Sequence, residues 1–486
     1  MVYILGVWFP KRRLVYLGAL ILYFAISKTL FDKIFATSHI VIDELFHIPQ
    51  GKVFCAGNYS HYDPKITTPP GLYVITTTHL GNMFFSCNIY NLRFANLMGS
   101  CFNFLIIMFL LILIYGRGLD IYLLMAQVFT LSTLPPLYFF SFVYYTDVWS
   151  LTFLLLYSAV SSLNNRHMFI ISFGITAIAM RQTNIAWVIM FFGHKCLEVF
   201  IKSSRVFGNR NLTSVQLGEN SLIGRDTDTS KLKRHYEFED FWIALKYHSG
   251  TYLTTFFKYV TLRDAKTIAS HLFIILTFAT FLVFNGSVAF GDKQAHEVTI
   301  HIPQLFYFLL FYGFFGLPFV LSKVPDTLSL IFRNKTRVLL IALLMLAIVH
   351  VNTLVHPYLL ADNRHYTFYI WNRWYGKYNF ARYVMVPIYT FLLLNLYENL
   401  RKHNCVSLLI SFCVSIFISL CFQKMIEIRY FLVPYMICRL RFRPPTYKYV
   451  ILEFLWYSII NVAFFYVFFT KEIKWENFEQ MQRIIW

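Results

Sequence analysis

The residues of this sequence that are best suited to chemistry lie in one stretch, residues 42–73, which is the most polar part of the first half of an apolar chain. It opens with adjacent carboxylates, Asp43 and Glu44, followed by His47 and Gln50. A partly desolvated carboxylate holds a raised pKa and can act as a general base. Acidic residues also stabilise the first turn of a helix, which is the commonest reason for them in such a position. The spacing alone leaves both interpretations open.

Two later segments, residues 356–382 and 423–446, combine arginine with histidine, tryptophan and tyrosine. Guanidinium groups bind phosphate through charge-assisted and often bidentate hydrogen bonds. Arginines beside apolar helices can instead extend toward the membrane interface without any ligand. One base and a phosphate-binding cluster suit glycosyl transfer from a phosphate-linked donor, because phosphate leaves without being protonated. A glycosidase would need two carboxylates across the scissile bond.

The composition identifies the kind of fold that must position these residues. Of the 486 residues 57% are hydrophobic and only 14% are charged, whereas average soluble domains are about 25% charged. We therefore predict an all-α polytopic membrane protein that forms a single integral domain, residues 1–486. The net charge of +19 is scattered along the chain, so basic cytosolic loops explain it better than nucleic-acid binding does.

The apolar runs and their basic flanks predict a topology. Three basic residues, 11–13, precede a first membrane helix and place the N-terminus in the cytosol. About twelve membrane helices follow from the count, with both termini cytosolic. The first loop, residues 36–91, and the segments 356–382 and 423–446 then lie in the lumen, and the polar segment 203–248 in the cytosol.

Local signals refine this topology. Pro135 and Pro136 should kink or break the apolar run 119–140, and Arg181 should lie at a boundary or cavity rather than in lipid. Cys55 and Cys87 are in the first lumenal loop, where they form a disulfide or remain free thiols. Two lumenal sequons make Asn58 and Asn285 candidates for glycosylation. Asp63 and Lys65 should fix a turn.

Three motifs resemble those of a known enzyme family. They are IDELFHIPQGKVFCAGNYSHYDPKITTPPGLY, HPYLLADNRHYTFYIWNRWY and EIRYFLVPY, and they begin at residues 42, 356 and 427. Together they resemble the dolichyl-phosphate-glucose α-1,2-glucosyltransferases of the endoplasmic reticulum. This family adds the last glucose to the lipid-linked oligosaccharide for protein N-glycosylation. The resemblance implies a GT-C type glycosyltransferase in the endoplasmic-reticulum membrane whose active site faces the lumen.

The resemblance also implies substrates and residue roles. Glucose would pass from dolichyl-phosphate-glucose to Glc2Man9GlcNAc2-diphosphodolichol with inversion, and no tightly bound metal or other cofactor is expected. Asp43 is the preferred catalytic base with Glu44 close behind, and His47 and Gln50 would bind the acceptor. The expected donor-binding residues are Asp362, Asn363, Arg364, His365, Tyr366, Arg373, Arg429 and Tyr430.

Two other classes of protein compete with this interpretation. A polytopic lipid or sugar transporter should show repeat symmetry and ionisable residues at the middle of the membrane. A non-catalytic regulatory subunit should tolerate the loss of Asp43 and Glu44. Neither alternative explains three separate polar lumenal motifs.

Overall fold

The structure, a computed structural model, is helical throughout the part of the chain that it describes. This part comprises residues 10–38, 40–81, 86–116, 118–163, 165–208, 252–291, 299–402, 404–442, 446–475 and 480–486. Within these residues there are two isolated β-bridges and no strand. The prediction of an all-α fold is confirmed. Most of the predicted cytosolic loop, from residue 209 onward, lies outside the described residues.

Six helices in the described part of the chain are long and apolar enough to cross a membrane. They are α1 (Pro10–Thr37), α5 (Ile89–Tyr115), α10 (Ile185–Gly208), α13 (Leu262–Asn285), α17 (Lys335–Asn352) and α24 (Tyr447–Thr470). The prediction of a polytopic membrane protein is confirmed at this level. α1 and α5 run antiparallel, because Tyr23 of α1 bonds Ser100 while the later Asp32 bonds Tyr90.

Shorter apolar helices fill the space between the long ones, and several of them are broken at proline. They are α6 (Ile121–Ser132), α7 (Pro135–Phe140), α8 (Asp147–Ser161), α9 (His167–Met180), α14 (Gln304–Phe315), α15 (Leu317–Ser322), α20 (Ala381–Val384), α21 (Val386–Arg401), α22 (Val406–Leu420), η4 (Ile428–Phe431) and α23 (Leu432–Arg439). Proline lacks an N–H donor and fits the first turn of a new helix. The predicted break at Pro135 is confirmed, because α6 ends at Ser132 and α7 begins at Pro135.

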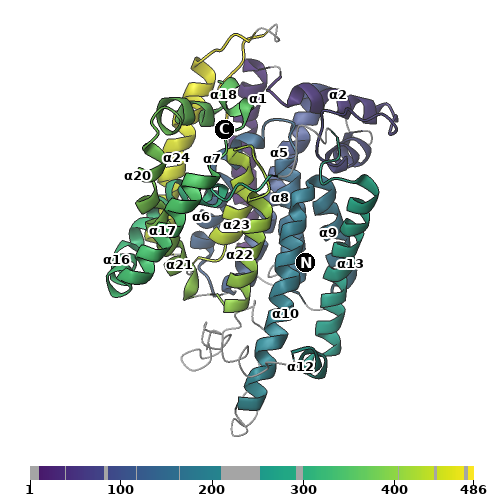
Figure 1. Ribbon diagram of the computed structural model, residues 1–486. Coiled ribbons are helices and arrows are strands. Elements are labelled where there is room, and N and C mark those ends of the chain that lie inside the picture. Colours follow the sequence, from purple (N-terminus) through teal and green to yellow (C-terminus); the bar gives the residue numbers. More distant parts are fainter. Residues whose placement is uncertain are drawn as a thin grey trace.

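Small helices lie at the two ends of the bundle (Figure 1). One end carries α2 (Glu44–Cys55), α3 (Gly71–Tyr73), the π-helix η1 (Val74–Gly81), α18 (Pro357–Ala361), α19 (Tyr366–Ile370) and the π-helix η3 (Trp371–Tyr375). We call this the α2 end. The opposite end carries α12 (Tyr252–Tyr259) and α16 (Val324–Arg333).

One predicted extramembrane segment instead passes through the bundle. Arg429 lies at the α2 end, where it contacts Asp43. Eleven residues later, the Leu440 carbonyl accepts a hydrogen bond from Tyr115, the last residue of α5, at the opposite end. Residues 428–440 thus run from the α2 end toward the opposite end of the bundle. That residues 423–446 face the lumen stays a prediction. η4 and α23 together form this helical passage through the bundle, which was not expected from the sequence.

The additional passage moves the C-terminus to the α2 end of the bundle (Figure 1). Ile485 pairs with His365, and the His365 ring bonds the Trp486 carbonyl at 3.0 Å. Pro10, at the start of α1, lies at the opposite end, since a helix of this length extends about 42 Å. Pro10 and the C-terminal tail thus lie at opposite ends of the bundle, and the side of the membrane that each faces stays a prediction.

A disulfide joins Cys55, at the end of α2, to Cys87, just before α5. Of the two alternatives that the sequence left open, the structure has the bridge. It closes a loop with a sequence separation of 32 residues, which begins at the last residue of α2 and contains α3 and η1. The bridge therefore fixes the C-terminal end of α2, within the polar stretch, to the start of a long membrane helix.

Removing this bridge should weaken the α2 end of the bundle. We expect Cys55→Ser or Cys87→Ser to lower the free energy of unfolding by about 2–4 kcal/mol, because the unfolded loop regains conformational freedom. Thermal unfolding under non-reducing conditions measures the change. Cys413→Ser, which replaces an exposed free cysteine, is the control and should unfold as wild type does. Equal unfolding temperatures in all variants would contradict the expectation.

Candidate functional site

The two adjacent carboxylates at the start of α2 have different surroundings. The Glu44 side chain has no exposed surface and forms an ion pair with Arg93 of α5, with Nε–Oε1 and Nη2–Oε2 distances of 2.8 and 2.5 Å. Its Oε2 also accepts from the Val41 N–H at 2.9 Å and its Oε1 from the Tyr144 N–H at 2.6 Å. Both oxygens are thus fully engaged. Glu44 ties the first loop to α5 and to the connection between α7 and α8.

Asp43 is accessible, since 34% of its side-chain surface is exposed. Its Oδ2 accepts a hydrogen bond from Arg429 Nη2 at 2.8 Å. Its backbone N–H donates to the Tyr145 hydroxyl at 3.0 Å, and that hydroxyl donates to the Val41 carbonyl at 3.1 Å. The Tyr145 hydroxyl therefore fixes the turn that presents Asp43.

This turn contains a strained residue. Ile42, between Val41 and Asp43, has a φ angle of +37°, which a β-branched side chain disfavours. Such a conformation costs about 1–3 kcal/mol and persists only where its surroundings hold it. The hydrogen bonds of Tyr145 and Glu44 on either side of Ile42 provide that support. The backbone is thus held in the one arrangement that buries Glu44 and leaves Asp43 open.

Arg429 connects two carboxylates at the start of the η4–α23 passage. Besides its bond to Asp43, its Nε donates to Glu427, and its guanidinium lies 5.5 Å from the centre of the Tyr145 ring. The side chain is 18% exposed. A partly exposed guanidinium beside the open carboxylate is available to an anionic ligand.

The structure adds an ion pair that sequence reasoning did not assign to the site. Arg181, which follows the last turn of α9, donates to Asp147 at the start of α8. The Arg181 guanidinium lies 5.6 Å from the centre of the Tyr430 ring. Asp147 is buried, and its Oδ2 has no hydrogen-bond partner in the described part of the chain. The sequence contained one sign of this ion pair. Asp147 stands at the beginning of one apolar run, and Arg181 stands at the end of the next.

Electrostatic interactions show that these side chains form one cluster. The charges of Arg429 and Arg181 both lower the pKa of His47, and the charge of Asp147 raises the pKa of Arg429. The described residues around Asp43 therefore contain two guanidinium groups beside one accessible carboxylate. This is the candidate active site.

Asp43 is ionised in this cluster. Burial raises its pKa, but the charge of Arg429 and its hydrogen bond to the carboxylate have the opposite effect. The net result is a pKa below the ordinary value. The expectation of a raised pKa is therefore wrong for the structure without substrate, because a guanidinium directly contacts the carboxylate.

His47 is buried one turn after Asp43 and is neutral. Its Nδ1 shares a 2.5 Å hydrogen bond with the Tyr73 hydroxyl. Burial, followed by the charges of Arg429 and Arg181, lowers its pKa to about 4, although Asp43 opposes the shift. A neutral imidazole can accept or donate a hydrogen bond without adding charge to the site.

The pKa of His47 gives the stability of the protein a pH dependence. An unfolded histidine binds a proton below about pH 6.5, whereas folded His47 does so only near pH 4. Lowering the pH through this window favours the unfolded state and destabilises the protein. We expect His47→Gln to flatten the fall of unfolding temperature between pH 6.5 and 4. An unchanged slope would show that His47 does not carry this effect.

Residues 362–366 lie against the C-terminal tail. Asp362 and Arg364 form a bidentate pair, at 2.7 and 2.9 Å, and the Arg364 guanidinium lies 4.0 Å from the centre of the Trp475 ring. Trp475 also donates to Asn363 Oδ1 at 2.8 Å. Of this segment, His365 is within electrostatic reach of Asp43. The C-terminal tail thus holds residues 362–366 in place, and with them His365.

Three other predicted site residues, Gln50, Tyr366 and Arg373, make contacts with residues outside the cluster around Asp43. The Gln50 amide bonds the His61 carbonyl at 2.9 Å and the Asp63 N–H at 2.8 Å, so it holds the first loop together. Arg373 is exposed and lies 5.2 Å from the centre of the Tyr369 ring, and Tyr366 packs 5.2 Å from the Trp486 ring. The predicted turn is confirmed, since Asp63 accepts from the Lys65 N–H.

The two glycosylation candidates differ in how their amide nitrogens are used. Asn58 is exposed, and only its oxygen forms hydrogen bonds with Ser60 and His61 in the described residues. The Asn285 nitrogen donates to the carbonyls of Ser287 and Ala289, both at 2.8 Å. Modification at either position stays a prediction, and Asn58 is the more accessible of the two.

The polar breaker at residues 67–71 attaches the first loop to α9. The Thr67 carbonyl accepts hydrogen bonds from Gln182 and from the Phe290 N–H. A Cβ atom at Gly71 would lie 2.4 Å from the Ala179 carbonyl oxygen, so only glycine permits this approach. These contacts bring Arg181, at the end of α9, to the edge of the first loop.

Fold and site together define a multi-pass helical membrane protein with a carboxylate–guanidinium site at one end of its bundle. The sequence model of the DIE2/ALG10 family matches residues 37–440, which include most of this site. The chain belongs to the DIE2/ALG10 family.

Curated relatives match along nearly the whole chain and are named Dol-P-Glc:Glc(2)Man(9)GlcNAc(2)-PP-Dol alpha-1,2-glucosyltransferase. The protein from Drosophila melanogaster is 40% identical over 95% of this chain and 96% of its own length. Those from Mus musculus and Homo sapiens are 32% and 31% identical, each over 92% of this chain and 93% of the relative. No solved structure matches the chain.

Proposed function

We propose that this chain is a glucosyltransferase of the endoplasmic-reticulum membrane. It transfers glucose from dolichyl-phosphate-glucose to Glc2Man9GlcNAc2-diphosphodolichol and forms an α-1,2 linkage, which completes the lipid-linked oligosaccharide. The names of three relatives that match it end to end support this substrate pair. Their names give no support to the alternatives of a transporter or a regulatory subunit. The observation that carries the mechanism is the accessible Asp43 paired with Arg429, with the Arg181–Asp147 pair next to Tyr430, the residue after Arg429.

In the proposed reaction Asp43 is the general base. It accepts the proton of the acceptor 2-hydroxyl while that oxygen forms a bond to C1 of the donor glucose. The bond between C1 and the phosphate oxygen breaks, and dolichyl phosphate leaves with the electron pair. Attack from the face opposite the phosphate converts the β-linked donor to an α-linked product. Glu44 acts only by holding the turn that presents Asp43, because its oxygens are already engaged.

Arg429 has a double role in this mechanism. In the absence of substrate it donates hydrogen bonds to both Asp43 and Glu427. The donor phosphate competes with Asp43 for the same guanidinium, and Arg181 adds a second positive charge to the leaving group. As Arg429 turns to the phosphate, the pKa of Asp43 rises and the carboxylate becomes a better base. Donor binding thereby activates the base.

The finer architecture is part of the proposal. We place the α2 end of the bundle in the lumen, in a GT-C type arrangement, with the N-terminus in the cytosol and the C-terminus in the lumen. No resident metal or other cofactor is proposed, and protein partners are left open.

A reporter at the C-terminus tests this topology. We expect a glycosylation acceptor sequence appended after Trp486 to be glycosylated in cells, because the C-terminal tail lies beside His365 at the α2 end. The same sequence placed before Met1 should remain unmodified. A glycosidase-induced shift in gel mobility measures the modification. An unmodified C-terminal reporter would contradict the passage formed by η4 and α23.

The activity itself is tested with purified full-length protein. Wild type is incubated in detergent with dolichyl-phosphate-glucose and a synthetic diglucosylated lipid-linked acceptor, and the product is identified by mass spectrometry and linkage analysis. The expected product gains one α-1,2-linked hexose. An acceptor that already carries the terminal glucose is the control and should be inert. The absence of product from folded protein would overturn the proposed function.

A further inference from the structure

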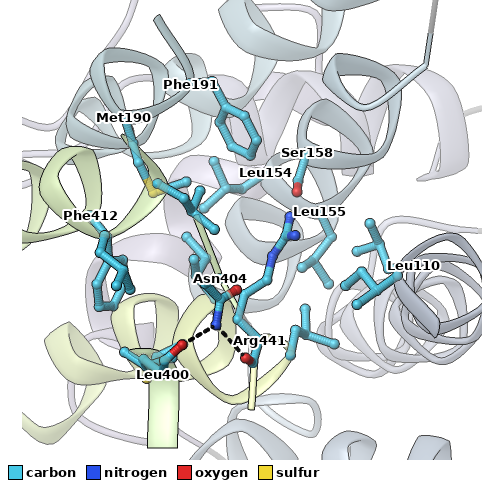
Figure 2. Close-up of a pocket in the computed structure, with 16 residues that line it drawn as sticks. Leu110, Leu154, Leu155, Ser158, Met190, Phe191, Leu400, Asn404, Phe412 and Arg441 are labelled. Carbon is cyan, nitrogen blue, oxygen red and sulfur yellow. Dashed lines mark hydrogen bonds between the residues drawn. The ribbon is translucent and has the colours of Figure 1, made fainter. Parts of the chain in front are cut away.

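A small cavity lies at the end of the bundle opposite the candidate active site, between α5, α8, α10, α22 and α23 (Figure 2). Its walls are mostly apolar side chains, among them Leu110, Leu154 and Phe412. Its volume is about 30 Å³, which is room for about two water molecules. Neither a sugar nor a lipid phosphate fits there. This cavity is therefore a gap in the packing rather than a binding site.

At the α2 end, the C-terminal tail pairs with the backbone on both sides of His365. The Ile485 N–H donates to the Arg364 carbonyl at 2.7 Å, and the Ile485 carbonyl accepts from the Tyr366 N–H at 3.2 Å. The side chain of Ile485 is buried. The tail therefore fixes the position of the His365 backbone.

The ring of Trp486 anchors this part of the tail. It stacks on Phe464 of α24 with 4.9 Å between the ring centres, and it lies 5.2 Å from the Tyr366 ring and 5.9 Å from the Phe315 ring. Three aromatic partners hold one side chain in a single orientation, because flat rings pack well only in a few arrangements. The Trp486 backbone is thereby held beside His365.

The ring that supports the tail is also connected to the candidate active site. Phe464 lies 5.0 Å from Phe139 of α7. The next residue of α7, Phe140, lies 5.3 Å from Tyr145, whose hydroxyl accepts from the Asp43 N–H. A continuous series of packed rings thus joins the tail to the turn that presents the proposed base.

The tail determines which nitrogen of the His365 ring carries a proton. Nδ1 lies 3.0 Å from the Trp486 carbonyl oxygen, and a carbonyl oxygen can only accept a hydrogen bond. Nδ1 is therefore the donor, and Nε2 of the neutral ring is left as an acceptor. Nε2 lies 4.0 Å from Asp362 Oδ2, and the ring is within electrostatic reach of Asp43. Within the described residues no hydrogen bond engages Nε2.

An acceptor nitrogen selects the chemistry of its ligand. The oxygens of a phosphodiester only accept hydrogen bonds at neutral pH, so they cannot bond to the lone pair of Nε2. A sugar hydroxyl carries the proton that this nitrogen needs. The side chain of His365 is 22% exposed, so a hydroxyl can approach it.

We propose that Ile485 and Trp486 are positioning residues for glucose transfer. They hold His365 so that its Nε2 accepts a hydrogen bond from a hydroxyl of a sugar substrate, while Asp43 acts as the base. This inference rests on the proposed function, since it assigns a role within the same active site. The hydroxyl belongs to the glucose of the donor or to the terminal sugar of the acceptor.

Steady-state transfer by purified full-length variants tests the proposal. We expect Trp486→Ala to lower kcat/KM by about 3–10-fold, the effect of losing one oriented hydrogen bond. His365→Asn should cause a similar loss, because its amide can still donate to the Trp486 carbonyl but nothing replaces Nε2. The double variant should lose no more than either single variant, since all three lack the same hydrogen bond. Met481→Ala, which changes an exposed residue of the same tail, should keep the wild-type rate.

The outcomes separate this inference from the proposed function. Additive losses in the double variant, or wild-type kinetics of Trp486→Ala, would overturn the inference while wild type still forms product. Absence of product from wild type would overturn the proposed function instead. A raised KM for dolichyl-phosphate-glucose identifies the donor glucose as the partner of Nε2, and a raised KM for the lipid-linked oligosaccharide identifies the acceptor.

Hydrogen exchange gives a readout that does not depend on activity. Trp486→Ala should speed the exchange of the peptide that contains the Tyr366 N–H, whereas His365→Asn and Met481→Ala should leave it unchanged. Equal exchange in wild type and Trp486→Ala would show that the tail does not hold His365. Should Trp486→Ala fail to fold, His365→Asn decides alone, because a wild-type rate in that variant excludes the role of Nε2.

Discussion

Asp43→Asn is expected to lower the rate of glucose transfer by about 10²–10⁴-fold, because an amide cannot accept the proton of the acceptor hydroxyl. The protein should remain folded, since Asp43 is partly exposed and a partly exposed ion pair contributes about 1 kcal/mol or less. Transfer is measured with saturating donor and acceptor, and unfolding temperature is measured on the same preparations.

Asp63→Asn is the matched control for this prediction. Asp63 belongs to the same loop and is also a carboxylate, but its Oδ1 accepts from the Lys65 N–H in a turn. We expect this variant to retain at least a tenth of the wild-type rate. Comparable activity of Asp43→Asn and wild type would show that the base lies elsewhere. His365, which is within electrostatic reach of Asp43, would then be the next residue to test.

Glu44→Gln should have the opposite pattern, with its main effect on stability. The change removes the charge that Arg93 is paired with in a fully buried ion pair. Breaking such a pair from one side costs about 3–5 kcal/mol, because a charge remains buried without compensation. The turn at Ile42 should also loosen, because the Val41 N–H loses the charged carboxylate oxygen, Glu44 Oε2, to which it donates. A lower unfolding temperature and a reduced yield of folded protein are the expected readouts.

Two further variants make this test specific. Asp32→Asn breaks an ion pair with Lys28 in which the side chains are 49% and 30% exposed, so it should change stability by less than about 1 kcal/mol. Replacing both partners, as in Glu44→Gln with Arg93→Met, should recover part of the loss, because no buried charge remains. Wild-type stability of Glu44→Gln alone would contradict the role assigned to the pair.

The difference between Asp43 and Glu44 illustrates what the sequence could not resolve. The two acids are adjacent at the start of one helix, so the sequence offers no strong reason to prefer one of them. Arg93 and the Tyr144 N–H decide the matter, and they lie 49 and 100 residues away from Glu44. The contacts of a side chain with distant segments are a property of the folded chain.

Several features follow from local physical chemistry and were predictable. The helical class and the long membrane helices follow from hydropathy, since a span needs about 20 apolar residues whatever surrounds it. The break at Pro135 follows from the missing N–H of proline. The turn at Asp63 follows in the same way from the preference of Asp-Pro for turns. None of these depends on a distant partner.

The tertiary structure alone decided which segments cross the bundle and which charges meet. Residues 428–442 were not recognised as a passage because arginines interrupt them, and the partner that compensates Arg439 is Glu453 on another helix. That passage in turn brings Arg429 to Asp43 and the C-terminal tail to His365. Arg181 meets Asp147 for the same reason. The sequence by itself determined the elements and the residue types that can perform chemistry, because these depend on neighbours in the chain. Their assembly into one site required the long-range packing that only the folded bundle provides.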